Sequence, residues 1–353
     1  MNRFAFSGTA REYFGIWIVN LLLTLVTLGI YSAWAKIRRL RYFYGNTHLD
    51  GHSFDYHARP LQILIGRIIV VVLLIAYNVL FNLTPYALVL LVPYALGLPW
   101  IINKALRFNA RMTSYRNVRF GFKGDYWSAF FAFILMPVGA LATAGILAPV
   151  MSREISNYIG RNLSYGNATI DTDAQLGALY RNWGAAIGYS LIWAVIVGGA
   201  AAILWIAFNT LAPGALDLAG EELADPEDNP FLMAIIGLAV VAVYATFFLG
   251  YLFYSCGVRN IAYQASRLDG EHGFHSDLSR GRYVWIQFSN AIVTVLTLGL
   301  MRPWAAVRSW GYKARHTGLA ASAPLAEIVA VAQREGNAAT AEFLDIEGID
   351  FGL

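Results

Sequence analysis

Histidine and aspartate side chains recur in the polar stretches between the long apolar segments of this sequence. His48, Asp50 and His52 alternate, so an extended strand would place all three on one face. A later stretch carries a similar set at Asp269, His272 and His275. Such sets can bind a divalent metal, and the candidate ligands are His48, Asp50, His52, His272 and His275. The alternative is that they are solvated hairpin residues, because a strand pattern alone does not fix ligand geometry.

Two polar residues lie inside the first long apolar segment and recur inside the last one. Asn20 recurs 270 positions later as Asn290. The same shift carries Thr24 onto Thr294. An amide within hydrocarbon needs a hydrogen-bond partner. We therefore expect either a helix–helix contact between the two copies or the polar lining of a pathway related by internal pseudo-symmetry.

Four cations end the first apolar segment, shortly after Trp34: Lys36, Arg38, Arg39 and Arg41. Arg308 occupies the position of Arg38 in the last segment. Cations at the ends of apolar segments commonly orient a membrane protein. The alternative is a site for anionic lipid headgroups, which attract lysine and arginine at the membrane surface.

The two segments that carry these residues match each other over a longer stretch. With a shift of 270 positions, eleven of the thirty residues from 20 to 49 are identical without a gap. In this comparison Thr27-Leu28-Gly29 meets Thr297-Leu298-Gly299. The pattern predicts an internal repeat in which the first and last membrane units are copies.

The composition is typical of an integral membrane protein. Of 353 residues, 58% are hydrophobic and only 14% are charged, whereas about 25% of residues are charged in soluble domains. The net charge of +4 does not indicate nucleic-acid binding, because the cations lie at the ends of apolar segments. The single cysteine, Cys256, excludes an internal disulfide and a multi-thiolate metal site. The first residues lack the features of a removable signal peptide.

Membrane units alternate with short polar stretches along the chain. This order predicts an all-α polytopic membrane protein with internal repeats and small cytoplasmic β-hairpins between membrane units. Asp50-Gly51 is typical of a hairpin turn, because glycine accepts a positive φ. Further hairpins are expected at 115–124 and 268–275. The predicted divisions are 1–60, 61–124, 125–182, 183–282, 283–323 and an acidic cytoplasmic tail at 324–353, with a short helix near 324–335.

The distribution of cations predicts which loops face the cytoplasm. Lysine and arginine are enriched in cytoplasmic loops, so the basic stretches are expected inside. The loops 82–86 and 210–230 lack both residues and are expected outside. Two apolar pairs, 61–106 and 184–255, fit this rule because each crosses the membrane out and back.

Three further apolar segments, each about one span long, do not fit this rule: 13–32, 126–150 and 283–301. One possibility is that they are ordinary spans, which gives seven spans in total. The other is that they re-enter on the cytoplasmic side, which keeps their basic flanks inside. The expected breaks for re-entry are Gly29, Pro137 with Gly139, and Gly299.

A long block near the start carries a family resemblance. From Glu12 to Arg39 it reads Glu-Tyr-Phe-Gly-Ile-Trp-Ile-Val-Asn-Leu-Leu-Leu-Thr-Leu-Val-Thr-Leu-Gly-Ile-Tyr-Ser-Ala-Trp-Ala-Lys-Ile-Arg-Arg, and Asn46-Thr-x-Leu-Asp-Gly51 follows. The block resembles the YjgN family of bacterial inner-membrane proteins, over nearly the whole chain. The resemblance implies a location in the bacterial inner (cytoplasmic) membrane, and the apolar segments predict a multi-pass protein. It carries over no catalytic or ligand-binding residue, because the family is a domain of unknown function.

Several function classes are disfavoured by what the sequence lacks. It contains no His-Glu-x-x-His, Gly-x-Ser-x-Gly, phosphate-loop, Gly-x-Gly-x-x-Gly or Cys-x-x-Cys motif. No Asp or Glu lies deep in an apolar segment. Because proton-coupled carriers usually depend on such carboxylates, this argues against an ion-driven pump.

Three hypotheses for function follow from these observations. The first is a passive transporter, channel or lipid-handling protein with a cavity between repeat units, near Asn20 and Asn290. The second is a structural or scaffolding membrane protein whose cytoplasmic hairpins bind a partner or anionic lipid. The third is a metal-dependent enzyme that uses the hairpin histidines. The expected partners are membrane lipids and their anionic headgroups, nucleic acid is not expected, and the one cofactor considered is a divalent metal.

Overall fold

Short strands from distant parts of the chain join into one antiparallel sheet. The computed structural model describes residues 1–83, 91–211 and 230–332. Within these ranges the sheet has eleven strands in the order β1-β11-β10-β9-β8-β7-β6-β5-β4-β3-β2. Their bounds are β1 Asn2–Arg3, β2 Ala5–Phe6, β3 Thr47–Leu49, β4 His52–Tyr56, β5 Thr113–Tyr115, β6 Val118–Phe122, β7 Leu163–Tyr165, β8 Ala168–Thr172, β9 Ser266–Leu268, β10 His272–Ser276 and β11 Thr317–Ala320.

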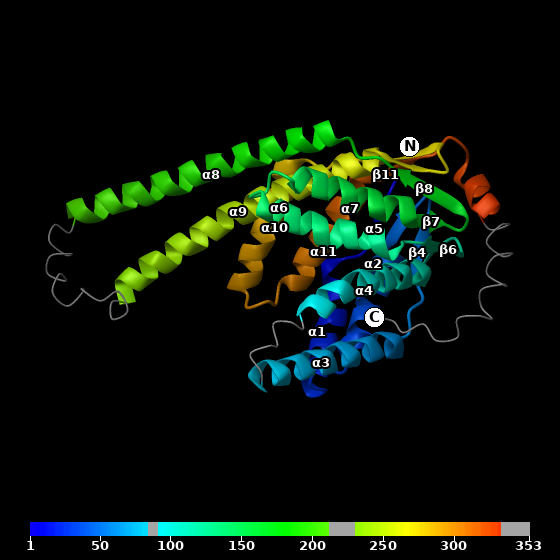
Figure 1. Ribbon diagram of the computed structural model, residues 1–353, viewed down its shortest axis with the longest axis horizontal. Helices are drawn as coiled ribbons and strands as arrows, with labels where there is room; N and C mark the ends of the chain where they lie inside the picture. The colour runs from blue at the N-terminus through cyan, green and yellow to red at the C-terminus, as the bar shows by residue number, and fades with distance from the viewer. Residues whose placement is uncertain (84–90, 212–229, 333–353) are drawn as a thin grey trace.

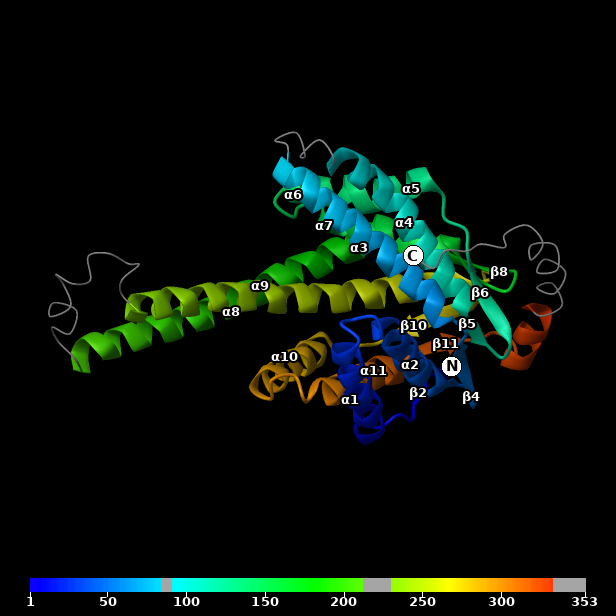
Figure 2. The same cartoon turned by 90° about the horizontal axis from the view of Figure 1, so that it is seen from below.

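Pairs of helices alternate with these strands along the chain. The pairs are α1 (Ala10–Val26) with α2 (Ser32–Gly45), α3 (Pro60–Leu83) with α4 (Leu91–Met112), α5 (Tyr126–Phe130), the π-helical η2 (Phe131–Leu135) and α6 (Met136–Ala142) with α7 (Ala148–Asn162), α8 (Leu176–Leu211) with α9 (Pro230–Gln264), and α10 (Arg280–Leu296) with α11 (Arg302–Arg315). Figure 1 shows the strands gathered at one end of the molecule. The long α8–α9 pair reaches farthest from them in Figure 1 and also in the turned view of Figure 2.

The amino-terminal segment closes the sheet almost into a ring. Asn2 of β1 pairs with Leu319 of β11. On the other side, Phe6 of β2 pairs with Thr47 of β3. Between the two strands, the backbone N–H of Phe4 donates to a carbonyl at the start of β11 at 2.9 Å. One short stretch of chain therefore joins the last strand to the first hairpin.

The predicted all-α fold with separate hairpins is wrong. The hairpins form, but each pairs with the next: β4 with β5, β6 with β7, and β8 with β9. In the first of these contacts, Phe54 lies opposite Tyr115. The pairing consists of backbone hydrogen bonds, which most side chains permit. Local turn signals therefore indicated the hairpins but not the sheet that they build.

The hairpin turns themselves are confirmed. Asp50 and Gly51 have φ angles of 49° and 73°, which suit a two-residue turn between twisted strands. Arg116 and Asn117 connect β5 to β6 with values of 47° and 65°. The third expected hairpin is formed by β9 and β10.

One face of the sheet is apolar and is covered by the start of the acidic tail. Residues at matching positions of five strands are buried there: Leu49, Tyr115, Tyr165, Leu268 and Leu319. A helix over 325–332 packs Leu325, Ile328 and Val329 against this cluster. The predicted short helix is confirmed for these residues, and the rest of the tail lies outside the described ranges.

Three of the helix pairs reverse direction through the same kind of turn. The Thr27 hydroxyl donates to the Leu23 carbonyl and accepts from the Tyr31 N–H. Leu28 and Gly29 follow in the left-handed region, with φ angles of 49° and 95°. The same hydrogen bonds and positive φ angles occur at Thr143-Ala144-Gly145 and Thr297-Leu298-Gly299. The apolar segments 13–32, 126–150 and 283–301 therefore each contain a chain reversal near their carboxyl-terminal end.

One of the expected breaks is wrong. Pro137 and Gly139 lie within α6, and the chain reverses only after that helix, at Ala144 and Gly145. Pro137 falls in the first turn of α6, directly after the π-helical η2. Pro137 has no N–H to donate, and this is tolerated in the first turn of a helix.

Three helices in the described ranges are long and apolar enough to cross a membrane: Pro60–Asn82, Leu176–Ile203 and Gly237–Gln264. They belong to α3, α8 and α9. The predicted pair 184–255 therefore contains two such helices, whereas 61–106 contains one. The predicted outer loops 82–86 and 210–230 fall mainly on residues outside the described ranges.

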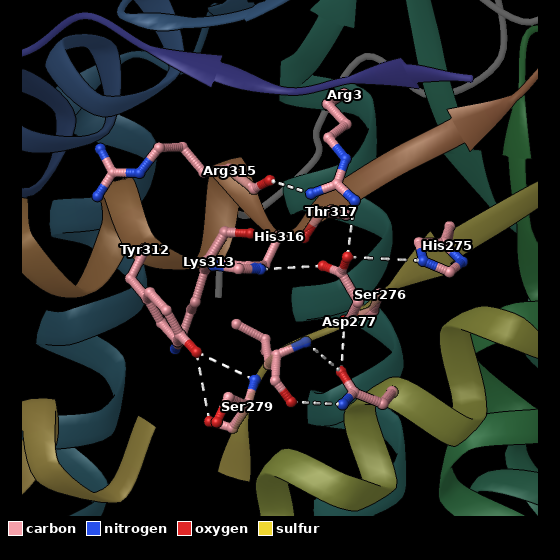
Figure 3. Close-up of polar contacts among 12 residues, drawn as sticks. Arg3, His275, Ser276, Asp277, Ser279, Tyr312, Lys313, Arg315, His316 and Thr317 are labelled. Carbon is pink, nitrogen blue, oxygen red and sulfur yellow. Dashed lines mark hydrogen bonds and ion pairs between the residues drawn. The ribbon is translucent and has the colours of Figure 1, made fainter. Parts of the chain in front are cut away.

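The Asp277 carboxylate contacts residues of neighbouring strands at the point where the sheet closes (Figure 3). Arg3 Nη2 donates to Asp277 Oδ2 at 2.7 Å, and His316 Nδ1 lies 3.0 Å from Asp277 Oδ1. Arg3 ends β1, Asp277 directly follows β10, and His316 directly precedes β11. Burial alone would raise the pKa of Asp277, but the hydrogen bonds from His316 and Arg3 and the charge of Arg3 lower it.

We expect Asp277→Asn to lower the free energy of unfolding by about 1 kcal/mol, because its contacts are charge-assisted but partly exposed. A carboxylate whose folded pKa is lowered stabilises the protein above its unfolded pKa, about 3.9. This contribution is lost as the pH falls through the lower folded pKa. At neutral pH the variant should therefore have a lower melting temperature than the native protein. At a pH below the folded pKa of Asp277 the two melting temperatures should be equal.

Asp171→Asn is the matched control for this prediction. Asp171 lies within β8 and also has an arginine partner, Arg161 at 3.5 Å, but its side chain is more exposed than that of Asp277. An equal loss of stability in both variants, or a loss that persists in acid, contradicts the role given to Asp277.

Candidate functional site

An open cavity of about 970 Å³ lies between the first and last helix pairs. Its wall contains all four polar residues that the sequence singles out within apolar segments: Asn20, Thr24, Asn290 and Thr294. The first two come from α1 and the last two from α10. Arg67 of α3 and Phe248 and Leu252 of α9 line its flanks. The fold thus brings residues 270 positions apart into one site.

The closure of the sheet positions the two walls of this cavity. Because β1 and β2 connect neighbouring strands, α1 packs against α11. The Trp310 indole N–H donates to the Thr47 hydroxyl at 2.9 Å. The ring centroids of Trp310 and Phe43 lie 4.9 Å apart. These contacts hold the first and last pairs side by side.

The cavity is electropositive. Lys36 and Arg39 of α2 line it together with Arg67 and Arg302, and its described lining contains no Asp or Glu. Lys36 lies outside the three candidate spans. Burial lowers the pKa of Lys36, and the charges of Arg67 and Arg39 lower it further. The cations therefore repel one another, and an anion between them would be stabilised.

The two matching asparagines differ in their hydrogen bonds. Asn290 Nδ2 donates to the Ala305 carbonyl at 3.2 Å and to the Ser309 hydroxyl at 2.8 Å. Its Oδ1 accepts from Arg308 at 3.0 Å. This contact joins α10 to α11 within one pair and does not join the two copies. Asn20 is 6% exposed, and its Oδ1 has no hydrogen-bond partner in the described part of the chain.

Lys36 and Arg39 line the cavity, but the other three predicted headgroup residues lie elsewhere. Arg38 lies over the Tyr31 ring, 5.6 Å from its centroid. Arg41 donates to two backbone carbonyls at and just after the end of β4. Arg308 lies over the Trp304 ring, 5.0 Å from its centroid. Arg38 and Arg308 therefore contact rings within their own helix pairs, and Arg41 links α2 to the end of β4.

Sequence reasoning missed two of the cavity's cations, Arg67 and Arg302. Arg67 stands within an apolar segment, where a charge is costly and usually kept for function. That signal was present in the sequence. The Arg67 guanidinium donates to the Ser32 hydroxyl, which links α3 to α2. Arg302 follows a helix turn, and no local pattern indicates that it faces the cavity.

The structure does not place the predicted metal ligands on one face. His48 pairs with Ser53 across the first hairpin, and the next residue pair contains His52. The two histidines therefore lie on opposite faces of the sheet. The expected alternation fails because the chain reverses at Asp50, so the three residues do not share one strand.

The hairpin histidines have partners within the protein. His48 Nε2 lies 3.0 Å from the Ser7 hydroxyl, and His272 Nδ1 lies 2.7 Å from the Ser322 hydroxyl. His275 Nε2 lies 3.8 Å from Asp277 Oδ2. In the described ranges, no group of three or more His, Cys, Asp or Glu could hold a metal ion. A metal at these residues stays a prediction.

Three long apolar helices, together with a cationic cavity beside apolar helix turns, define an integral membrane protein. The chain belongs to the DUF898 family, described as bacterial protein of unknown function, whose model matches residues 1–346. The family resemblance seen in the first apolar block is confirmed by this match and by the relatives that follow.

Curated relatives that match the chain carry the name inner membrane protein YjgN. The chain is 37% identical over 142 residues to those of Escherichia coli O157:H7 and strain K12, and these matches cover 38% of the chain. They span 36% of each relative's length. The relative from Salmonella typhimurium is 25% identical over 348 residues, which cover 88% of the chain and 87% of that protein. No solved structure matches the chain.

These names agree with the three apolar helices in the described ranges, and together they support a location in the inner membrane. The relatives' names state a location and no activity. What the cavity binds is therefore argued from its own residues.

Proposed function

We propose that this chain is a multi-pass inner-membrane protein that binds the anionic headgroup of a lipid in the cavity between α1–α2 and α10–α11. The observation that carries the proposal is the convergence of four cations without a lining carboxylate in the described ranges: Lys36, Arg39, Arg67 and Arg302. Lysine and arginine bind phosphate through charge-assisted hydrogen bonds. The volume of about 970 Å³ lies within the usual range of small-molecule sites, roughly 300–1,000 Å³.

The apolar part of the cavity favours a lipid over a free anion. Beside the cations, the lining includes Trp17, Leu21, Phe248, Leu252 and Val295. A soluble anion gains nothing from apolar walls, whereas a lipid buries its acyl chains against them. The cavity therefore offers one surface for a headgroup and another for hydrocarbon.

We infer that the three short helix pairs enter the membrane from the cytoplasmic side and turn within it. α1 has 17 residues, so its length is about 25 Å at roughly 1.5 Å per residue. This is less than the roughly 30 Å of a hydrocarbon core. At the turns, Leu28 and Leu298 are 94% and 95% exposed, as suits contact with lipid. Both ends of each pair return to the sheet.

We also infer that the first and last pairs are copies of one module. A shift of 270 positions carries the bounds of α1 onto those of α10 and the bounds of α2 onto those of α11. The turns between them have φ angles of 49° at Leu28 and at Leu298, and of 95° and 90° at the glycines that follow. The two walls of the cavity therefore present equivalent positions to a ligand.

The proposed topology predicts where single cysteines react with a membrane-impermeant maleimide. In a Cys256→Ala background, cysteines at the exposed strand positions His52, Arg119 and Thr169 and at the exposed hairpin-turn position Glu271 should all react from the cytoplasmic side only. Cysteines at Leu28 and Leu298 should be protected from both sides, because hydrocarbon excludes the charged reagent. Labelling of either turn from the periplasm, or sheet positions divided between compartments, contradicts re-entry.

The proposed lipid site predicts a loss of binding when its cations are removed. We expect Lys36→Ala/Arg39→Ala to bind phosphatidylglycerol about 30-fold more weakly, at about 1 kcal/mol for each cation near a headgroup. Lipid titration followed by native mass spectrometry of the purified protein measures the effect. Arg38→Ala is the matched control, because Arg38 is on the same helix but outside the cavity lining. Equal binding by all three proteins, or an equal loss in both variants, contradicts the proposal.

A further inference from the structure

The cations of the cavity lie on both of its walls. Lys36 and Arg39 belong to α2 of the first pair, whereas Arg302 is the first residue of α11 in the last pair. Arg302 repeats neither of the α2 cations, because the shift of 270 positions relates it to Ser32. The fourth cation, Arg67, comes from α3 and donates to the Ser32 hydroxyl. Positive charge is therefore divided between the two walls.

These charged side chains are accessible and lack a counter-charge from the protein. Lys36, Arg39 and Arg302 are exposed, and Arg67 is half-buried. In the described ranges none of the four forms an ion pair with an Asp or a Glu. Both walls line a single cavity of about 970 Å³, near the upper end of the usual size of ligand sites. One ligand can therefore contact both walls.

Apolar surface is also present on both walls. Trp17 and Leu21 of α1 line the side of the first pair. Val295, near the end of α10, lines the side of the last pair. Phe248 and Leu252 extend that second apolar surface, because they belong to α9, which packs against α10. Each cationic wall therefore has apolar surface of its own, against which hydrocarbon can be buried.

This division of charge indicates the chemistry of the ligand. A lipid with a single phosphate diester carries one negative charge and would leave three of the four cations without a counter-charge. Like charges that stay unmatched in a partly apolar cavity repel one another. Two phosphates joined by a short linker would give each wall an anion of its own. The linker also makes the second contact intramolecular, which raises affinity over that of a single phosphate.

Resting on the proposed function, we propose that the cavity selects a lipid with two linked phosphates, as in cardiolipin, over lipids with one. Lys36 and Arg39 bind the first phosphate, with Arg67 beside them. Arg302 binds the second phosphate on the opposite wall. The acyl chains of each half lie against the apolar surface of the same wall. Arg302 is therefore the residue that distinguishes a two-phosphate headgroup from a single phosphate.

The test compares three lipids by titration and native mass spectrometry of the purified chain. Cardiolipin carries two phosphates, phosphatidylglycerol carries one, and phosphatidylethanolamine is zwitterionic. The native protein should bind cardiolipin about fivefold more tightly per phosphate than phosphatidylglycerol, the effect of one further cation near a headgroup. In Arg302→Gln this preference should fall to about one, because cardiolipin binds more weakly while phosphatidylglycerol binds as before.

Two further variants separate recognition from a structural role. Arg315 is an exposed arginine of the same helix outside the cavity lining, so Arg315→Ala should keep the native preference. Arg302→Lys retains the positive charge and should keep most of the preference. An equal loss in Arg315→Ala, or a loss of phosphatidylglycerol binding in Arg302→Gln, would overturn the role given to Arg302. The comparison of lipids on the native protein depends on no variant.

The possible results separate this inference from the proposed function. Equal binding of cardiolipin and phosphatidylglycerol per phosphate, both above phosphatidylethanolamine, overturns two-phosphate selection and leaves anionic lipid binding intact. A cardiolipin preference that persists in Arg302→Gln overturns the assignment of the second phosphate. Equal binding of all three lipids overturns the proposed function itself. If the water-soluble, deacylated headgroup of cardiolipin competes as strongly as the intact lipid, the site belongs to a soluble bisphosphate and the lipid assignment is wrong.

Discussion

Backbone hydrogen bonds made by residues 2–6 hold this arrangement together, because they join the last strand to the first hairpin. A sheet without this segment would have two open edges, and the helix pairs at its ends would be separated. With the segment in place, α1 packs against α11 and Trp310 reaches Thr47. The cavity is therefore a consequence of strand pairing, and the carboxylate of Asp277 reinforces that pairing.

The site gains its character from differences between two matching helix pairs. Both pairs carry an asparagine one turn before a threonine, and both reverse through Thr-Leu-Gly. In the last pair, Ser309 and Arg308 satisfy the asparagine. In the first pair, Lys36 and Arg39 replace Ala306 and Ser309, so charge replaces internal hydrogen bonding. The two walls of the cavity therefore differ, with Lys36 and Arg39 on the wall from the first pair and Arg302 on the wall from the last pair.

Local chemistry explains which features could be predicted from the sequence. Asp50-Gly51 indicates its turn because few residues accept positive φ, and Asn20 and Thr24 attract notice because polar groups are costly in apolar helices. The ring of strands could not be predicted in this way, because pairing between hairpins depends on backbone groups common to all residues. The predicted common face for His48 and His52 was wrong because the chain turns between them at Asp50. Their side chains therefore lie on opposite faces of the sheet. Arg302 reaches the cavity only through the tertiary fold.

The most direct measurement is an experimental density map of the chain in a phosphatidylglycerol nanodisc. The account predicts the amino-terminal strand between β11 and β3, the α1–α2 and α10–α11 pairs side by side, and headgroup density beside Lys36 and Arg39. A map in which those pairs stand apart, or in which protein side chains fill the space between Asn20 and Asn290, contradicts it.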